Sequence, residues 1–396
     1  MPPMPNFCQL IENELNDNIL PFWIEHTVDH ENGGFYGAIT NDLQIRNDVE
    51  RSAVLTARIL WTFSAAYQQF PRPEYLQMAQ RAYETLLKNF WDAEHGGIYW
   101  TVDKTGQPLN QRKQTYAQAF AIYGLAEYHA ASGSSESLET AKKLFTLLEN
   151  QAADPQFGGY IEARFHDWGE LADMRLSALE PNCPKSMNTL LHVLEAYTRL
   201  YQLWPDPKLR QALRDQLEIM QAHVIDHERG TFHLFFERDW RVISDEISYG
   251  HDIEGSWLLL EAAEALGDEP LLTHIRLAAV KMATAVYENG RDSDGAIWYA
   301  ANPSGLVDDN KHWWPQAEAL VGFYNAYKLS GDIRFLGAVR QLWQVINEKF
   351  VDRKHGEWFK IIDRAGNPLL DHVKTGPWEC PYHNARACLE LLKRLK

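Results

Sequence analysis

Apolar residues recur at intervals of three and four along most of the chain, which is the spacing of one face of an α-helix. The segments 51–70 and 73–91 both carry this pattern and meet at a proline-containing break, FPRP. Equivalent pairs follow at 115–130 with 137–152, 186–204 with 206–225, 251–267 with 269–289, and 314–330 with 333–350. A last segment, 382–395, is expected to pair with the N-terminal segment 7–28. The pattern therefore predicts about twelve helices in six pairs.

A second pattern, a glycine turn followed by aromatic-rich alternation of apolar and polar residues, separates the helix pairs. Two copies read ENGGFYGAITNDLQI from residue 31 and EHGGIYWTVDKTGQPL from residue 94. Short alternating runs between turn residues are typical of β-hairpins. Six copies occur at spacings of 61 to 71 residues, and their marker glycines are Gly34, Gly97, Gly159, Gly230, Gly295 and Gly356. A repeat of this length indicates a fold built from similar units packed side by side.

Two helices cannot bury their apolar faces alone, whereas six pairs can close into an inner ring of helices wrapped by an outer ring. We therefore predict an all-α fold, an (α/α)6 barrel with short β-hairpins at one end, that forms a single domain over residues 1–396. The helix that follows each hairpin should start at the same end of the ring. The six helix starts, with the positive ends of their dipoles, should then face one cavity.

Ionisable and aromatic residues gather at these predicted helix starts. In chain order they are Arg58, Tyr116, Asn188, His192, His251, Glu254, Trp257, Trp313, Trp314, Glu318, Trp378 and His383. One histidine near a helix start is more often structural than catalytic, but three at equivalent places favour a shared catalytic role. Lys374 is expected to be a solvated loop residue, because nothing around it indicates desolvation.

Charge and composition narrow the class of partner. The formal net charge of -16 and the pI near 5.4 argue against a nucleic acid or an anionic membrane surface. With 14 Trp, 17 Tyr and 17 Phe, the chain has more aromatic residues than a core needs, and such residues often stack on sugar rings. We therefore expect a small-molecule sugar as the partner, and a chain that is a monomer or a weak homodimer.

The N-terminus lacks the features of a signal peptide, and no apolar run approaches the roughly 18 residues of a membrane span. A cytoplasmic protein is expected. Four scattered cysteines lack the spacing of a zinc site, and they are expected to be reduced thiols.

Paired histidines suit proton transfer at a carbon atom, because imidazole titrates near neutrality and serves as base or acid. A proton next to a carbonyl becomes removable when the resulting enediolate is stabilised, and Arg58 with helix N-terminal amides would supply that stabilisation. This set favours epimerisation of an open-chain aldose at C2, without a metal or other cofactor.

Three alternatives stay open at this point. Glu254 and Glu318 are available as the carboxylate pair of a glycoside hydrolase. His251 and Glu254, three residues apart, could share a metal, although a third ligand is missing. The toroid could also bind a sugar or a protein without catalysis.

Six segments resemble the cellobiose 2-epimerases, members of the N-acylglucosamine 2-epimerase superfamily. They are RILWTFS, KQTYAQAFAIYGLAEY, SMNTLLHVLEAY, SYGHDIEGSWLL, WWPQAEALVGF and KTGPWECPYHNARACLE, and they run through nearly the whole chain. The resemblance implies an (α/α)6 barrel that opens a reducing-end sugar and interconverts glucose and mannose at C2 through a cis-enediolate. Its expected substrates are β-1,4-linked disaccharides such as cellobiose and lactose.

The same resemblance implies a role for each matching residue. His251 and His383 would be the acid and base, Arg58 and His192 would hold O1 and O2, and Glu254 would position a histidine and assist ring opening. The residues implied in sugar binding are Tyr116, Asn188, Trp257, Trp314, Glu318 and Trp378, with Trp314 and Trp378 stacking on the rings.

One position departs from the resemblance. Cellobiose 2-epimerases typically read NTHLHVLEA at the third helix start, whereas this chain reads NTLLHVLEA, with Leu190 in place of the first histidine. The retained His192 should preserve the chemistry, while the less polar neighbourhood leaves the preference for disaccharides open. Mannose 2-epimerases and ketose-forming isomerases share the scaffold, so free mannose or glucose is the alternative substrate.

Overall fold

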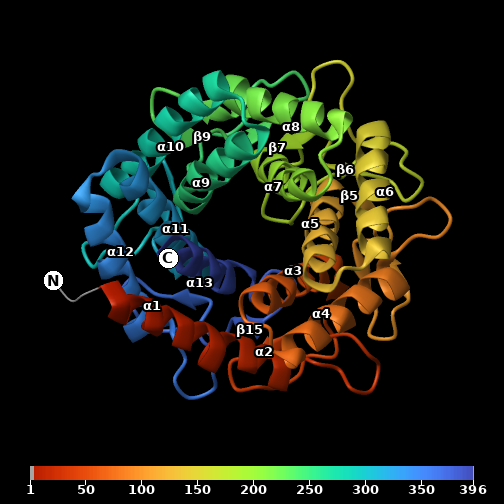
Figure 1. Ribbon diagram of the computed structural model, residues 1–396, viewed down its shortest axis with the longest axis horizontal. Coiled ribbons are helices and arrows are strands. Elements are labelled where there is room, and N and C mark those ends of the chain that lie inside the picture. Colours follow the sequence, from red (N-terminus) through yellow and green to blue (C-terminus); the bar gives the residue numbers. More distant parts are fainter. Residues whose placement is uncertain (1–3, 396) are drawn as a thin grey trace.

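The computed structural model describes residues 4–395 and shows two concentric rings of helices (Figure 1). The inner ring consists of α3 (Ala53–Gln69), α5 (Thr115–Ser132), α7 (Met187–Leu203), α9 (Tyr249–Leu266), α11 (Trp313–Ser330) and α13 (Tyr382–Leu395). Each inner helix packs against the next, and α13 packs against α3, which closes the ring. The predicted (α/α)6 barrel is confirmed.

The outer ring consists of helices that each follow or precede an inner one, several of them ending in a short π-helical turn. They are α1 (Met4–Asn13) with η1 (Glu14–Ile19) and α2 (Leu20–His26), α4 (Pro73–Thr85) with η2 (Leu86–Phe90), α6 (Ser135–Gln151), α8 (Pro207–Ile219) with η3 (Met220–Val224), α10 (Glu269–Asn289), and α12 (Ile333–Val345) with η4 (Ile346–Phe350). α5 is buried on every side from Thr115 to Tyr128, whereas α8 buries only one face. This difference in apolar pattern separates inner from outer helices.

Short antiparallel strands gather at the end of the ring where the inner helices start. They are β1 (Ile39–Thr40), β2 (Arg51–Ser52), β3 (Thr101–Val102), β4 (Pro108–Asn110), β5 (Lys113–Gln114), β6 (Ala163–Arg164), β7 (Lys185–Ser186), β8 (Ile225–Asp226), β9 (Thr231–Phe232), β10 (Phe235–Phe236), β11 (Ala300–Asn302), β12 (Gly305–Asp308), β13 (Lys311–His312), β14 (Ile361–Ile362) and β15 (Val373–Thr375). The strand before an inner helix pairs with the hairpin region of the next repeat, as β5 does with β6 and β13 with β14. β15 pairs with β1, so the last repeat is joined to the first.

A buried ion pair recurs at these hairpins. In each pair a lysine or arginine from the strand before an inner helix donates to the aspartate that accepts the backbone N–H groups of a hairpin turn, as Lys113 does to Asp92 at 2.6 Å. The other pairs are Arg51–Asp29, Lys185–Asp154, Lys311–Asp292 and Lys374–Asp352. The fourth hairpin has the aspartate, Asp226, but Ile247 precedes α9 at the position of the cation.

Lys374 therefore corrects the expectation of a solvated loop residue. Its side chain is fully buried, and Nζ donates to Asp352 at 2.6 Å and to the carbonyl of Gly356 at 3.0 Å. The neighbouring residues in the sequence carry no sign of this burial, because the aspartate that receives it lies 22 residues earlier, in the turn of the preceding hairpin.

Within residues 4–395, the helices lack the combination of length and apolar character that a membrane crossing requires.

Candidate active site

Three histidines from three inner helices lie near the end of the ring where the inner helices start, and we call the region around them the chamber. His192 lies on α7, His251 on α9 and His383 on α13. Each uses Nδ1 for a hydrogen bond: His192 with Glu195 at 2.9 Å, His251 with Ser248 at 2.7 Å and His383 with Glu318 at 2.7 Å. Among the described residues, no hydrogen bond involves their Nε2 atoms. A carboxylate at Nδ1 favours the tautomer whose Nε2 lone pair is free to accept a proton.

The environment keeps two of these histidines neutral. Burial, with the charge of Arg58 and the neighbouring His192, lowers the pKa of His251 to about 3. Burial and the guanidinium groups of Arg58 and Arg386 hold the pKa of His383 well below its usual value. Both rings are therefore unprotonated at neutral pH, which is the state that a base at carbon requires.

His251 and His383 both lie beside one tryptophan, Trp314. The ring centroid of Trp314 is 4.7 Å from that of His251 and 5.5 Å from that of His383. α9 and α13 both flank α11, which carries Trp314. The two histidines can therefore approach a bound molecule from different directions.

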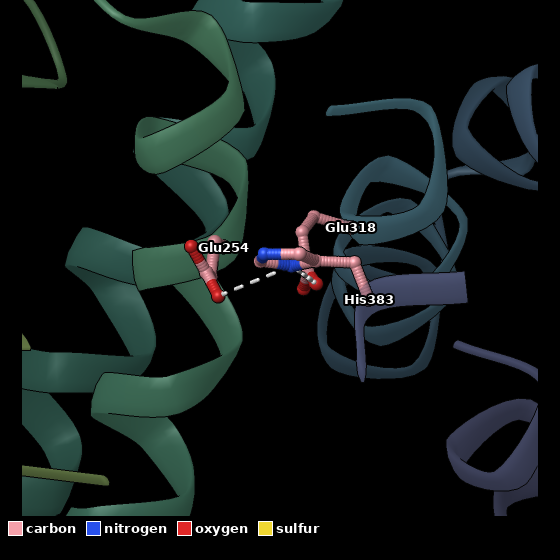
Figure 2. A group of neighbouring side chains, drawn as sticks. All are labelled: Glu254, Glu318 and His383. Atoms are coloured by element: carbon pink, nitrogen blue, oxygen red, sulfur yellow. Dashed lines mark hydrogen bonds and ion pairs between the residues drawn. The ribbon is translucent and has the colours of Figure 1, made fainter. Parts of the chain in front are cut away.

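A cluster of charges lies directly beneath the histidines. Figure 2 shows Glu254 from α9 and Glu318 from α11 converging on His383 from α13. Arg386 Nη2 donates to Oε1 of Glu318 at 2.7 Å and also to Oε1 of Glu254. Burial and the charge of Glu254 raise the pKa of Glu318, against the opposing effect of Arg386. The pKa of His383 is therefore lowered and that of Glu318 is raised, and the two groups are joined by a hydrogen bond at Nδ1 of His383.

Glu254 does not form a hydrogen bond with His251, although the two residues lie on the same face of α9. His251 and Glu254 are three residues apart on α9, yet His251 bonds Ser248, and the carboxylate of Glu254 lies 4.0 Å from Nδ1 of His383. Oε2 of Glu254 is buried with no partner among the described residues. Helical spacing places two residues on one face but leaves open the side chain that each one contacts.

Arg386 and Glu195 are functional candidates that sequence reasoning missed. Arg386 Nη1 donates to Oε1 of Glu195, which also accepts from the hydroxyl of Tyr382. Burial acts to raise the pKa of Glu195, but Arg386 and His192 lower it overall. The signal was present in the spacing, since Arg386 follows His383 by three residues and Glu195 follows His192 by three.

Arg58, on α3, lies near the same Tyr382 ring as Arg386, with the two guanidinium carbons 5.0 Å and 4.2 Å from its centroid. Nη2 of Arg58 donates to the hydroxyl of Tyr116 at 2.7 Å, and Nη1 donates to Sγ of Cys380 at 3.6 Å. The guanidinium carbon lies 4.3 Å from the ring centroid of Phe120. Arg58 has no carboxylate partner among the described residues, so its charge is available to an anion that forms in the chamber.

The remaining predicted residues lie at two depths. Trp378 is half-buried at the mouth, with its centroid 5.8 Å from that of Tyr116. Asn188 lies one turn before His192 and has a buried Oδ1 without a partner among the described residues. Trp257 is deeper: it is 1% exposed and donates from Nε1 to Glu318 at 3.2 Å.

Leu190 points away from the chamber. It is the fourth residue of α7, as Gln118 is of α5, and Gln118 bonds both backbone groups of Ile98 in the preceding hairpin. A Cβ on Gly159, in the hairpin before α7, would lie 3.5 Å from Leu190 Cδ2. Residues 190 and 192 lie on different faces of the helix, so the departure at Leu190 does not reach His192.

Glu254, Glu318 and His383 place ligand atoms within 4.8 Å of one another, which is close enough to share a metal ion. The guanidinium of Arg386 donates to both carboxylates. A cation of the chain thus already contacts both carboxylates and offsets part of their charge.

Comparison with known proteins agrees with this architecture. A family model described as N-acylglucosamine 2-epimerase matches residues 34–387. A cellobiose 2-epimerase of Bacteroides fragilis is 45% identical over 385 residues, which cover 97% of this chain and 98% of that protein. The solved structure of the cellobiose 2-epimerase from Bacillus thermoamylovorans superposes with a TM-score of 0.94 at 38% identity and covers 99% of this chain and 100% of that one.

A solved D-mannose isomerase, at 21% identity and a TM-score of 0.84 over 98% of this chain and 97% of that one, shares the fold. The match of the family model over most of the chain and the near-complete coverage of relatives place the protein among sugar epimerases. The chain belongs to the N-acylglucosamine 2-epimerase family of isomerases.

Proposed function

We propose that this sugar 2-epimerase interconverts glucose and mannose at the reducing end of β-1,4-linked disaccharides such as cellobiose and lactose, without a cofactor. The observation that carries the proposal is the pair of neutral histidines, His251 and His383, beside Trp314 on the two helices that flank its own. The similarity to proteins named cellobiose 2-epimerase over nearly their full length supports the choice of substrate.

The reaction begins with ring opening, which exposes the C1 carbonyl of the reducing sugar. The free Oε2 of Glu254 is available to take part in moving the proton between O1 and O5. Trp314 and Trp378 would stack on the sugar rings, and Tyr116 and Asn188 would bind hydroxyl groups.

One histidine then removes the proton from C2 through Nε2, and the electron pair of the C–H bond forms the C1–C2 double bond while O1 becomes an oxyanion. Arg58 and Nε2 of His192 would stabilise the enediolate oxygens. The intermediate turns about C2–C3, and the first histidine releases its proton to water. The second histidine takes a proton from water at Nε2 and delivers it to the other face of C2, while the C1 carbonyl forms again. Both histidines thus end neutral, as they began.

Glu318 and Trp257 act through other residues in this scheme. Glu318 accepts from Trp257 and Arg386 and holds Nδ1 of His383. Its proposed contribution to sugar binding is thus to fix the ring that faces the sugar. Because Arg386 binds both Glu254 and Glu318, these carboxylates are poorly placed for the separate acid and base roles of a hydrolase.

The test is incubation in heavy water with cellobiose, lactose, mannose and glucose in parallel, resolving aldoses from ketoses. The proposal predicts that cellobiose and lactose turn over fastest and give the 2-epimer with one deuterium at C2. An unlabelled epimer would contradict proton exchange, and a rise in reducing ends would indicate hydrolysis. A ketose as the main product, or faster turnover of mannose, would favour the alternative of a monosaccharide isomerase or epimerase.

A further inference from the structure

The fourth residue of two inner helices holds the hairpin that precedes the helix. On α5 that residue is Gln118, whose side chain accepts from the N–H of Ile98 at 2.7 Å and donates to the carbonyl of the same residue at 2.7 Å. On α11 it is Gln316, which makes the same two bonds with Ile297 at 2.7 Å and 2.9 Å. A side-chain amide suits this position because it carries both an acceptor and donors.

On α9 the fourth residue is an aspartate, Asp252. Its Oδ1 accepts from the N–H of Phe232 at 2.7 Å. Phe232 is the counterpart of Ile98 and Ile297, since each of the three pairs across its hairpin with the residue just before the turn aspartate. Oδ2 of Asp252 is buried with no partner among the described residues. An ionised carboxylate only accepts, so it cannot make the second bond that the glutamines make.

The surroundings of Asp252 favour a proton on its carboxyl group. The residue is fully buried, and within residues 4–395 it forms no ion pair. Burial raises the pKa of this carboxyl well above its ordinary value, against the opposing effect of the bond from Phe232. Tyr249, on the same helix, is neutral because burial raises the pKa of its hydroxyl. A buried carboxyl without a cation takes up a proton, and it then carries one donor and one acceptor, as an amide does.

Charged groups on the elements packed against α9 bond elsewhere. They are Asp226 in the turn of the hairpin, Lys281 on α10, Arg214 with Glu218 on α8, and Glu195 and Glu318 with Arg386 on α7, α11 and α13. Lys281 donates to a backbone carbonyl of the hairpin turn, and Asp226 accepts from two N–H groups of that turn. A charge on Asp252 would therefore lack a partner.

The hairpin lies close enough to α9 for a side chain shorter than glutamine. A Cβ on Gly255, three residues after Asp252, would lie 2.2 Å from Cε2 of Phe232. The lack of a side chain at this glycine lets the ring of Phe232 pack directly on the helix. An aspartate is one methylene shorter than a glutamine, so a bond from position 252 to the same backbone position requires this close approach.

We propose that Asp252 is a neutral carboxylic acid that donates from Oδ2 to the carbonyl of Phe232, and that it positions the first turn of α9, which carries His251. Its two bonds match those of Gln118 and Gln316 in the neighbouring repeats. The protonation rests on this geometry alone, whereas the effect on turnover rests on the proposed function of His251.

Unfolding of the full chain in urea between pH 5 and pH 7 tests the protonation. The carboxyl ionises in the unfolded chain with a pKa of about 3.9 but stays protonated in the folded chain, so it lowers the stability of wild type as the pH rises. Asp252→Asn keeps both bonds and cannot ionise. The unfolding constant of wild type relative to this variant should therefore rise by up to about ten-fold per pH unit. A ratio that stays flat or falls would overturn the proposal.

Asp226→Asn is the matched control in the same hairpin. Against the effect of burial, the N–H groups of Arg229 and Glu228 lower the pKa of Asp226. It is therefore ionised in both states between pH 5 and pH 7, and its ratio of unfolding constants should not change with pH. Infrared difference spectra of wild type and Asp252→Asn at pH 7 give a second readout. The carbonyl band of a protonated carboxyl should occur in wild type alone, and a carboxylate band in its place would overturn the proposal.

Turnover tests the positioning role. Asp252→Leu removes both bonds, and Leu190 shows that leucine fits the equivalent position of α7. This variant should lower kcat roughly ten- to hundred-fold with KM nearly unchanged, because a small displacement of a catalytic group slows the chemical step. Asp252→Asn should keep kcat within about two-fold of wild type. Full activity of the folded leucine variant, or loss of activity in the asparagine variant, would overturn this role. If His251→Ala is also active, the proposed function fails, while the unfolding result for Asp252 stands.

Discussion

Two of the regions that hold buried charges, the hairpins and the cluster beneath the histidines, arrange them differently. At the hairpins a lysine or arginine meets one aspartate, and the pair recurs in five of the six repeats. Beneath the histidines a single guanidinium, that of Arg386, meets three glutamates from three different helices, and within residues 4–395 no other repeat has such a cluster.

This difference in arrangement distinguishes a structural role for the hairpin pairs from a catalytic role for the cluster beneath the histidines. A pair that recurs with the repeat joins a strand to a hairpin turn wherever that junction occurs. The Arg386 cluster occurs once, so it is not part of the repeat. It lies where His192 and His383 need carboxylate partners at Nδ1. The fourth repeat, which lacks the hairpin cation, is also the one that supplies His251, whose Nδ1 has a serine rather than a carboxylate.

The largest expected effect is on the histidines above the unrepeated cluster. His251→Ala and His383→Ala should each lower kcat for epimerisation by roughly 10³-fold or more, because each removes an acid or base that acts at carbon. Assays of product formation check this, with thermal unfolding to show that the fold persists. His274→Ala, an exposed histidine on outer helix α10, is the control and should retain full activity. Near-normal turnover in either site variant would refute the assignment.

The second effect distinguishes the two kinds of buried charge. Arg386→Met leaves Glu195, Glu254 and Glu318 without their cation and should destabilise the fold by about 3–5 kcal/mol. Arg386→Lys should restore much of the stability but little of the activity, because an ammonium group cannot reproduce the planar contacts of a guanidinium. Urea unfolding and kcat measured on the same samples test both expectations.

Lys113→Met is the matched change at a hairpin. It should lower stability by about 1–3 kcal/mol, since Asp92 keeps its backbone N–H donors, while kcat of the folded protein stays within about two-fold of wild type. A loss of activity as large as that of the Arg386 variants would contradict a purely structural role for the hairpin pairs.

The third effect is a pH dependence. His251 binds a proton in the unfolded chain near pH 6.5 but in the folded chain only near its pKa of about 3. Between these values the unfolded state holds more protons, so this residue lowers stability by up to about 1.4 kcal/mol per unit of falling pH. Unfolding at pH 7.0 and pH 5.5 should therefore show a smaller loss for His251→Gln than for wild type, and equal losses would contradict the shift.

The lowered pKa also predicts where activity fails. Short assays should show kcat/KM holding well below pH 6.5, because both histidines stay neutral there. A fall in kcat/KM centred near pH 6.5 would indicate that the pKa values of the two histidines are not lowered.

The smallest expected effect concerns Leu190. Leu190→Gln introduces the side chain that Gln118 uses toward its own hairpin, so kcat should stay within about two-fold of wild type. A ten-fold change for either cellobiose or mannose would show that this position reaches the site after all.

Much of this account was predictable from the sequence because the ring repeats. The period of helices and hairpins predicted the fold, and the equivalence of helix starts predicted that His251 and His383 lie at the same end of the ring, while their catalytic roles stay predictions. The hydrogen-bond and ion-pair partners of the side chains were not predictable in the same way. Glu254 lies on the same helical face as His251, yet Arg386, 132 residues away, binds it. The prediction for Lys374 was wrong for a different reason: its partner, Asp352, lies 22 residues earlier, beyond the neighbouring residues on which that prediction rested.

Contacts within a helix follow from local spacing, whereas contacts across the ring depend on its closure. Arg386 and Glu195 were missed because their importance lies in contacts between helices that are far apart in the chain. The sequence showed that each residue follows a histidine by three positions. It did not show that Arg386 and Glu195, on different helices, contact each other.

The central claim, that two histidines serve opposite faces of C2, is tested most directly by proton exchange in the single variants. Each variant is incubated in heavy water with cellobiose and, separately, with its 2-epimer, and deuterium at C2 of the unreacted sugar is measured. The account predicts that His251→Ala exchanges the proton of one epimer only, that His383→Ala exchanges that of the other, and that neither variant epimerises. Exchange of both epimers by one variant, or of the same epimer by both, would contradict it.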